Sequence, residues 1–378
     1  MAENLAHRGL AVTIVEAARQ VMPPLDPEMA WLVEEQLQAK GVHLRLGEGV
    51  TGFEAHDGRI RVKTAATSID TDLVILAIGV RPETGLARAA GLEIGKAGGI
   101  VVDDQMRTSD PSIFAVGDAV ETVDFVTGAH QVVPLAGPAN RQGRIAADVI
   151  AGKPSRFRGV QGTAVCGAFG LTIASTGASE KALRRAGITD YDAIYLHPGH
   201  HVGYYPGARS IHLKVLYRRS DGRLLGAQAV GEDGTEKRMD VLATAIQLGG
   251  TVHDLAEVEL CYAPQFGAAK DPVNIAGFIA ENIRSGDLPL ARWDEVPGAT
   301  VLDVRDPQEV QGGGIPGALN VPLHQLRTRH GELPNDRPLL VMCAVGQRAY
   351  YAVRLLRQFG YDARHLSGGW RTGRTLVG

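Results

Sequence analysis

The chain has 378 residues, of which 44% are hydrophobic, and its formal net charge at pH 7 is −3. This length and apolar content favour a multidomain globular protein with two or three buried cores. The nearly balanced charge argues against nucleic-acid binding, which favours a clearly basic surface. No apolar run approaches the roughly 20 residues that span a bilayer, and no signal peptide is visible, so we expect a soluble, cytoplasmic protein without membrane contacts.

The three cysteines, Cys166, Cys261 and Cys343, lie far apart and form no CxxC motif or Cys/His cluster. We therefore expect neither a disulfide framework nor a metal site, and any cysteine that matters should act as a thiol. Cys166 lies in a run of apolar and small residues, which favours burial over reactivity. Cys261 remains a secondary candidate because it precedes Tyr262.

Residues 1–95 are typical of a partial nucleotide-binding domain. Residues 1–7 are expected to be helical, and an apolar strand over 10–16 ends in Glu16. A helix, a glycine and a strand ending in an acidic residue form the second half of a dinucleotide-binding βαβ unit, in which the acidic residue binds ribose hydroxyls. The glycine-rich turn of such a unit would fall before Met1.

The same domain continues with alternating elements. We predict a helix that starts after Asp26, with Pro27 in its first turn, and extends to about residue 40. A short strand over 42–46, a glycine-punctuated meander over 59–69 and a fully apolar strand over 73–79 follow. This alternation predicts a parallel sheet with helical crossovers, so the fold class is α/β.

Three further regions follow in the chain. Residues 96–153 contain an expected strand over 113–117, the turn residue Gly117, the acid Asp118 at the end of that strand and a helix over 139–151. Residues 154–285 are strand-rich, with strands over 211–217 and 224–230 and a helix over 235–248, which indicates an α+β domain. Residues 286–378, after a Gly/Asp/Pro linker, form a separate βα series.

Residues 108–119 and 137–144 resemble the second half of the FAD domain in the pyridine nucleotide-disulfide reductase superfamily. The resemblance implies that Asp118 binds the flavin ribitol chain and that Ala139 and Asn140 lie near the flavin pyrimidine edge. Gly117 permits a tight turn at a strand end, and the following helix presents its positive end to an anion or a polarised carbonyl.

Glu16 and residues 76–82 are similar to the NAD(P)H-binding elements of the same family. There the acid pairs with ribose hydroxyls and repels a 2′-phosphate, which favours NADH over NADPH, although this preference rests on Glu16 alone. Gly79 would allow close approach to the cofactor. Without this setting, Glu16 would be read as an ordinary surface carboxylate.

Residues 200–208 and 262–274 resemble the dimerisation domain of coenzyme A-disulfide reductases and their NADH oxidase and persulfide reductase relatives. The resemblance implies a homodimer in which one subunit lends tyrosines to the site of its partner. Tyr262 and one of Tyr204 or Tyr205 would then approach the substrate, because a phenol can donate a hydrogen bond to sulfur. The alternative is that these aromatic side chains only pack in an interface.

Residues 303–348 resemble a single rhodanese domain, including the strand that ends in Cys343. The loop from Cys343 to Arg348 can direct backbone N–H groups at the sulfur, which stabilises a thiolate or persulfide. We therefore predict Cys343 as the sulfur carrier and Arg348 as the organiser of its loop. In residues 311–314, Gln-Gly-Gly-Gly stands where a histidine is common, which affects local packing or substrate access.

Together these resemblances imply an FAD-dependent NAD(P)H oxidoreductase that reduces coenzyme A disulfide or persulfide sulfur and is coupled to a rhodanese carrier. Coenzyme A would be substrate or ligand. The family's first FAD half, with its glycine-rich turn and redox cysteine, has no counterpart here, so we expect an N-terminally truncated chain that is colourless and inactive as a reductase. Two alternatives remain: a sulfurtransferase that uses the rhodanese domain alone, and an inactive dimerising fragment.

Overall fold

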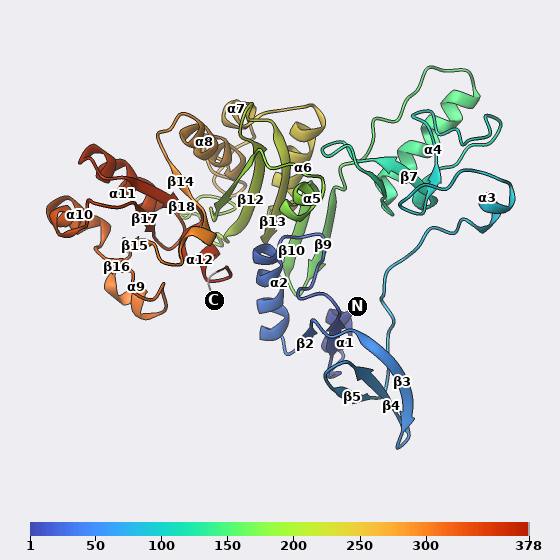
Figure 1. Cartoon of the computed structure of the whole chain (residues 1–378), viewed down its shortest axis with the longest axis horizontal. Helices are drawn as coiled ribbons and strands as arrows, with labels where there is room; N and C mark the ends of the chain where they lie inside the picture. The colour runs from blue at the N-terminus through green and yellow to red at the C-terminus, as the bar shows by residue number, and fades with distance from the viewer. Residues whose placement is uncertain (377–378) are drawn as a thin grey trace.

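A computed structural model describes residues 1–376 and shows three regions side by side (Figure 1). A five-stranded sheet with its helices lies at the centre, a smaller α/β domain lies on one side of it, and the segment that contains α3 and α4 lies on the other. Among the described residues, no helix is both long and apolar enough to cross a membrane.

The central domain is built on an antiparallel sheet with the strand order β11-β12-β13-β10-β9. Its strands are β9 (Ala164–Ala168), β10 (Leu171–Gly177), β11 (Tyr191–Leu196), β12 (Ile211–Arg218) and β13 (Leu224–Gly231). Its helices are α5 (Glu180–Arg185), α6 (Thr235–Gln247), α7 (Val252–Glu257) and α8 (Pro272–Arg284). This arrangement confirms the α+β domain predicted from the strand-rich sequence.

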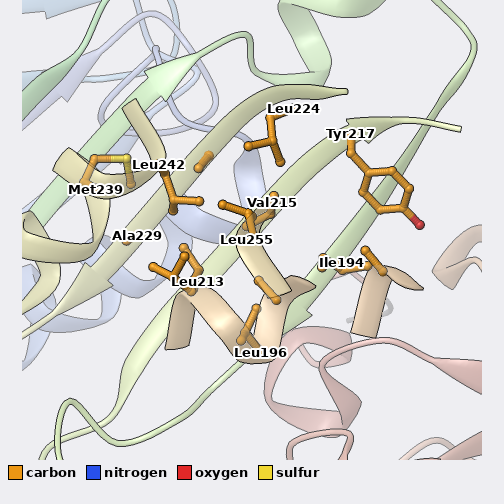
Figure 2. Packing of buried hydrophobic residues seen from close by; sticks show 14 of the residues in the cluster. Ile194, Leu196, Leu213, Val215, Tyr217, Leu224, Ala229, Met239, Leu242 and Leu255 are labelled. Atoms are coloured by element: carbon orange, nitrogen blue, oxygen red, sulfur yellow. The ribbon is translucent and has the colours of Figure 1, made fainter. Parts of the chain in front are cut away.

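One face of the central sheet packs on α6, α7 and α8. Leu213 and Val215 of β12 lie in one cluster with Leu242 of α6 and Leu255 of α7, all fully or almost fully buried (Figure 2). Burial of each large aliphatic side chain contributes about 1.5–3 kcal/mol. The opposite face of β11 and β12 is therefore the one left free to meet other parts of the chain.

The C-terminal domain is a parallel sheet with the order β14-β18-β17-β15-β16. The strands are β14 (Leu290–Ala291), β15 (Thr300–Asp303), β16 (Leu319–Asn320), β17 (Leu339–Met342) and β18 (Ala363–Leu366). The helices are α9 (Pro307–Gln311), α10 (Leu323–Arg329), α11 (Gln347–Gln358) and α12 (Gly369–Gly373). All four residues of β17 are buried, as expected for a central strand covered on both faces.

The N-terminal region contains α1 (Ala2–His7), β1 (Thr13–Glu16), α2 (Pro27–Ala39) and β2 (His43–Leu46), with β1 and β2 paired in parallel. The predicted helix after Asp26 is thus confirmed. A meander of β3 (Val50–His56), β4 (Arg59–Thr64) and β5 (Ser68–Thr71) follows. Met29 and Val33 of α2 share a core with Ile173 and Val230 of the central sheet, so α2 is fastened to that sheet.

The strand predicted over residues 73–79 is wrong. This segment has no regular structure and runs as an extended stretch between β5 and α3 (Gly85–Ala89) (Figure 1). Leu76 is 65% exposed and Ile78 is 88% exposed. An apolar run becomes a strand only where neighbouring strands supply backbone partners, and within residues 1–376 the β1–β2 pair does not extend to it.

The strand predicted over residues 113–117 is also wrong. Phe114 forms only an isolated bridge with Arg107, and Gly117–Ala119 is a short 3₁₀ helix. The surrounding region consists of β6 (Ile100–Val101), β7 (Val120–Val123), β8 (His130–Val132) and α4 (Ala136–Ile150). Ile113 and Val116 are partly exposed, so the segment lacks both the pairing and the burial that would make it a strand.

A buried ion cluster joins α2 to the central sheet. The ammonium of Lys214 on β12 lies 2.8 Å from Asp26, 2.5 Å from Glu28 and 2.6 Å from Glu180, and the Lys214 side chain has no exposed surface. The Tyr195 hydroxyl also donates to Glu28. Burial alone would raise the pKa of Asp26, but the charge of Lys214 and the hydrogen bonds to Asp26 lower it overall.

The Lys214→Met substitution should destabilise the protein by about 3–5 kcal/mol, because it leaves the buried carboxyl groups of Asp26 and Glu28 and the partly buried one of Glu180 without their counter-charge. Urea unfolding monitored by circular dichroism measures this loss. Lys153→Met is the matched control: its side chain is 67% exposed and pairs, among residues 1–376, with Asp148 alone, so its midpoint should change little. Equal midpoints for the two variants would contradict the structural role of the cluster.

Candidate functional site

Cys343 directly follows β17, at the carboxyl end of the parallel sheet. The backbone N–H of Gly346 donates a hydrogen bond to the Cys343 Sγ over 3.2 Å. Gly346 has a φ of +99°, a conformation that glycine adopts without a steric penalty, and it directly precedes α11. The loop therefore directs a backbone dipole at the sulfur, next to the positive end of a helix.

The sulfur site is closed in this structure. Cys343 has no exposed surface, whereas Val345 in the same loop is 36% exposed. A sulfur donor therefore has no open path to the Cys343 side chain in this structure. A closed site also excludes water, which strengthens the hydrogen bond to a charged sulfur.

Arg348 lies in the first turn of α11 and forms a bidentate ion pair with Glu309 of α9. Both contacts are 2.7 Å, and Asp306 lies 3.8 Å from the same guanidinium. The hydrogen bonds from Arg348 lower the pKa of Glu309 to about 2, and the Glu309 carboxylate in turn raises the pKa of Arg348. This pair ties α9 to the start of the helix that follows the cysteine loop.

Two glycines of residues 311–314 have a structural reason. Gly313 has a φ of +123°, a conformation that other residues rarely adopt, and a Cβ atom added at Gly314 would lie 3.0 Å from the Arg305 guanidinium. Arg305 donates to the Gly313 carbonyl over 2.8 Å and pairs with the buried Asp303. A side chain at Gly313 would therefore be strained by the backbone, and one at Gly314 would require Arg305 to move.

His365 of β18 lies next to the cysteine loop, and no sequence motif marks it as a site residue. Its Nε2 lies 3.0 Å from the Gly346 carbonyl, and its Nδ1 has no partner among the described residues. Burial lowers the pKa of His365 to about 4, so the ring is neutral near pH 7. Only the tertiary fold brings β18 next to the loop, which is why spacing in the sequence could not reveal this contact.

Tyr204 and Tyr262, predicted as site residues, lie together. Their hydroxyl groups are 3.3 Å apart, and the hydrogen bond to Tyr204 raises the pKa of Tyr262. Tyr204 is 76% exposed. Tyr205 instead contacts the ring of His201 edge-on, so the structure joins Tyr262 with Tyr204 and not with Tyr205.

The other two cysteines, Cys166 and Cys261, are both exposed. Cys166 is exposed on β9, an edge strand of the central sheet, so its predicted burial is wrong. Its partial desolvation still raises the pKa of the thiol, which disfavours the thiolate. Cys261 is also exposed, next to Tyr262.

The predicted cofactor residues lie in separate places. Glu16 ends β1, and its carboxylate accepts a hydrogen bond from the Ala18 N–H. Gly79 lies in the extended segment with a φ of +90°. Asp118 is exposed on the 3₁₀ turn, and Asn140 lies on α4.

The 3₁₀ turn and α4 are joined to each other. The Gly117 N–H donates to the Gln142 side chain over 2.7 Å, and a Cβ atom at Gly117 would lie 3.9 Å from that of Ala139. An open hollow beside α4 is lined by Ala139, Asn140, Arg141, Gly143 and Arg144. The turn and α4 are therefore in contact, and the hollow beside α4 contains the amide of Asn140 and the guanidinium groups of Arg141 and Arg144.

Comparison with known proteins accounts for all of these regions. Residues 1–143 match the family description "Pyridine nucleotide-disulphide oxidoreductase", residues 163–271 match its dimerisation domain, and residues 289–373 match the rhodanese-like domain. The crystal structure of reduced Bacillus anthracis CoADR-RHD superposes with a TM-score of 0.96 at 44% identity, covering 100% of this chain and 68% of that one.

This chain belongs to the pyridine nucleotide-disulphide oxidoreductase family. A NAD-dependent persulfide reductase from A. fulgidus has 38% identity and a TM-score of 0.91, covering 98% of this chain and 69% of that one. The NADH oxidase of Methanocaldococcus jannaschii is 37% identical over 73% of this chain and 61% of its own length. The coenzyme A disulfide reductase of Staphylococcus epidermidis is 31% identical over 74% of this chain and 63% of its own length. The chain thus spans less than two thirds of the length of the M. jannaschii and S. epidermidis relatives.

Acid should destabilise the rhodanese-like domain through His365. The unfolded ring has a pKa near 6.5 and the folded one about 4, so the unfolded state binds a proton first as the pH falls. Protonation of this ring in the unfolded state therefore lowers the free energy of unfolding as the pH falls from 6.5 to 4. The decrease amounts to about 2 kcal/mol between pH 7 and pH 5. Urea unfolding at both pH values measures the loss, which should be smaller in His365→Gln; equal losses in both proteins would contradict it.

Proposed function

We propose that this chain supplies the NAD(P)H-binding, dimerisation and sulfur-carrier parts of an FAD-dependent oxidoreductase that reduces coenzyme A disulfide or persulfide sulfur. The observation that carries the proposal is the closed loop at Cys343, in which the Gly346 N–H donates to the sulfur. The family membership and the named persulfide reductase and coenzyme A disulfide reductase relatives support the same chemistry.

Cys343 would act as a sulfur carrier. Its thiolate attacks the outer sulfur of a persulfide or polysulfide donor, the S–S bond of the donor breaks, and the remaining thiolate leaves. The product is a persulfide on Cys343, which then passes its outer sulfur to an acceptor thiolate by the reverse exchange. The Gly346 N–H stabilises the negative charge before and after each step, and the Arg348–Glu309 pair holds the helix that begins beside it.

The turn at Gly117 and the first part of α4 fit one side of a flavin nucleotide. Gly117 keeps the space in front of Ala139 free of a side chain, and Asn140 contributes an amide to the hollow. Asp118 would accept hydrogen bonds from cofactor hydroxyls. When bound, FAD would accept hydride from NAD(P)H and pass electrons to the sulfur substrate.

The remaining site residues complete the proposal. Glu16 would bind the adenosine ribose hydroxyls and favour NADH, after its carboxylate releases the Ala18 N–H. Gly79 would allow close approach of the nicotinamide cofactor. In a homodimer, Tyr262 and Tyr204 would approach the sulfur substrate bound to the partner. Tyr204 is preferred over Tyr205 because its hydroxyl lies 3.3 Å from that of Tyr262.

A second candidate function is sulfur transfer by the rhodanese-like domain alone. The observation that favours it is the five-stranded parallel sheet around Cys343, which has its own buried core. This function needs only a sulfur donor and a thiol or cyanide acceptor, without flavin or NAD(P)H.

Cys343→Ser should abolish the cyanide-labile sulfur of the protein, because serine forms no persulfide. The measurement is release of thiocyanate by cyanide after incubation with a polysulfide donor. Cys166→Ser is the matched control and should retain the full amount, since Cys166 lies on β9 of the central sheet and is not part of the cysteine loop. Cyanide-labile sulfur retained in Cys343→Ser would contradict the assignment of Cys343 as the sulfur carrier.

A further inference from the structure

The cysteine loop rests on a segment that the central domain holds in place. Residues 367–373 directly follow β18, and the N–H groups of Trp370 and Arg371 donate to the carbonyls of Cys343 and Ala344 over 2.7 and 3.0 Å. A Cβ atom at Gly369 would lie 2.4 Å from the Cys343 carbonyl oxygen and 2.8 Å from the Gly346 nitrogen. Residues 367–373 therefore form the floor of the cysteine loop.

The other side of this floor contacts β11 and the residue after it. The Tyr195 N–H donates to the Ser367 hydroxyl over 2.9 Å, and a Cβ atom at Gly368 would lie 2.7 Å from the Tyr195 Cβ. His197 Nε2 lies 3.0 Å from the Thr372 hydroxyl. One layer of backbone thus separates β11 from the sulfur site.

His197 is itself fixed by a second histidine. Its Nδ1 lies 2.8 Å from Nδ1 of His212 on β12, so one ring donates and the other accepts. Burial, together with Arg371 and Arg374, lowers the pKa of His212 to about 4, and burial also lowers the pKa of His197. Both rings are neutral near pH 7 and act as hydrogen-bonding groups rather than as charges.

We propose that His197 is a positioning residue for the Cys343 loop: its hydrogen bond to Thr372 holds the floor of residues 367–373, so that the Gly346 N–H stays directed at Sγ. The inference rests on the proposed function, because it gives the dimerisation domain a part in sulfur transfer by Cys343. Sulfur chemistry in the rhodanese-like domain then depends on its contact with the central sheet.

Two amide variants separate the two hydrogen bonds of His197. The His197→Gln amide reaches about as far as Nε2 and can keep the bond to Thr372, whereas the His197→Asn amide reaches only about as far as Nδ1. Thr372→Val removes the hydroxyl from the other side with little change in volume, and Thr372→Ser retains it. His253→Asn, at an exposed ring on α7 that pairs with Glu281, is the control.

The test is the pH dependence of Cys343 alkylation by iodoacetamide in the full chain, followed on the Cys343 peptide by mass spectrometry. The high-pH plateau reports access to the sulfur, and the rate at pH 7 relative to that plateau reports stabilisation of the thiolate. We expect this ratio to fall roughly threefold to tenfold in His197→Asn and Thr372→Val, as for loss of one hydrogen bond to the sulfur. His197→Gln, Thr372→Ser and His253→Asn should keep the ratio of the unsubstituted protein.

The double variant His197→Asn/Thr372→Val should show no larger loss than either single variant, because both remove the same bond. An unchanged ratio in both single variants would overturn the proposal, as would equal losses in His197→Asn and His197→Gln. If one variant does not fold, the other decides. A shifted ratio in a protein that carries no cyanide-labile sulfur would leave the positioning role intact and reject the proposed function instead.

Discussion

The ammonium of Lys214 is the contact on which the arrangement of this protein depends. It lies without exposed surface among Asp26, Glu28 and Glu180, and so joins α2 to the face of the central sheet opposite α6 and α7. Buried charges are costly unless they are paired and hydrogen-bonded, so this geometry permits little displacement of α2. The hydroxyl of Tyr195 extends the cluster towards β11, where the rhodanese-like domain is seated.

The same face of β11 and β12 therefore serves two neighbours. Tyr195 contacts the ion cluster through its hydroxyl and Ser367 through its backbone, while His197 bonds to Thr372. Arg374, just beyond α12, pairs with Glu35 of α2 and lies over the Trp31 ring. The sulfur loop is thus supported by a surface composed of three segments distant in sequence, which explains why its geometry is a property of the whole chain.

Much of this architecture could be predicted from the sequence. The order of domains, the helix after Asp26 and the strand that ends at Cys343 follow from hydrophobic periodicity, capping residues and motif spacing. The strand predicted over residues 73–79 was wrong, because an apolar run forms a strand only where neighbouring strands pair with it, and the run itself does not encode those neighbours. The predicted burial of Cys166 was wrong for a related reason, since small and apolar residues also occur on an exposed edge strand.

Other features depended on tertiary contacts alone. Lys214, His197 and His365 each stand in sequence surroundings without a motif, and each acquires its role from a segment more than 15 residues away. A polar residue inside a strand predicts only that it needs a partner. For Lys214 the partners come from α2 and α5, and for His365 the partner is a carbonyl in the cysteine loop.

The central claim is that the closed loop makes Cys343 the residue that carries sulfur. Its most direct test is peptide mass spectrometry of the intact chain after brief exposure to a persulfide donor, with alkylation to trap the product. The account predicts one added sulfur atom on the Cys343 peptide and none on the peptides of the exposed Cys166 and Cys261. Added sulfur confined to Cys166 or Cys261, with Cys343 unmodified, would contradict it.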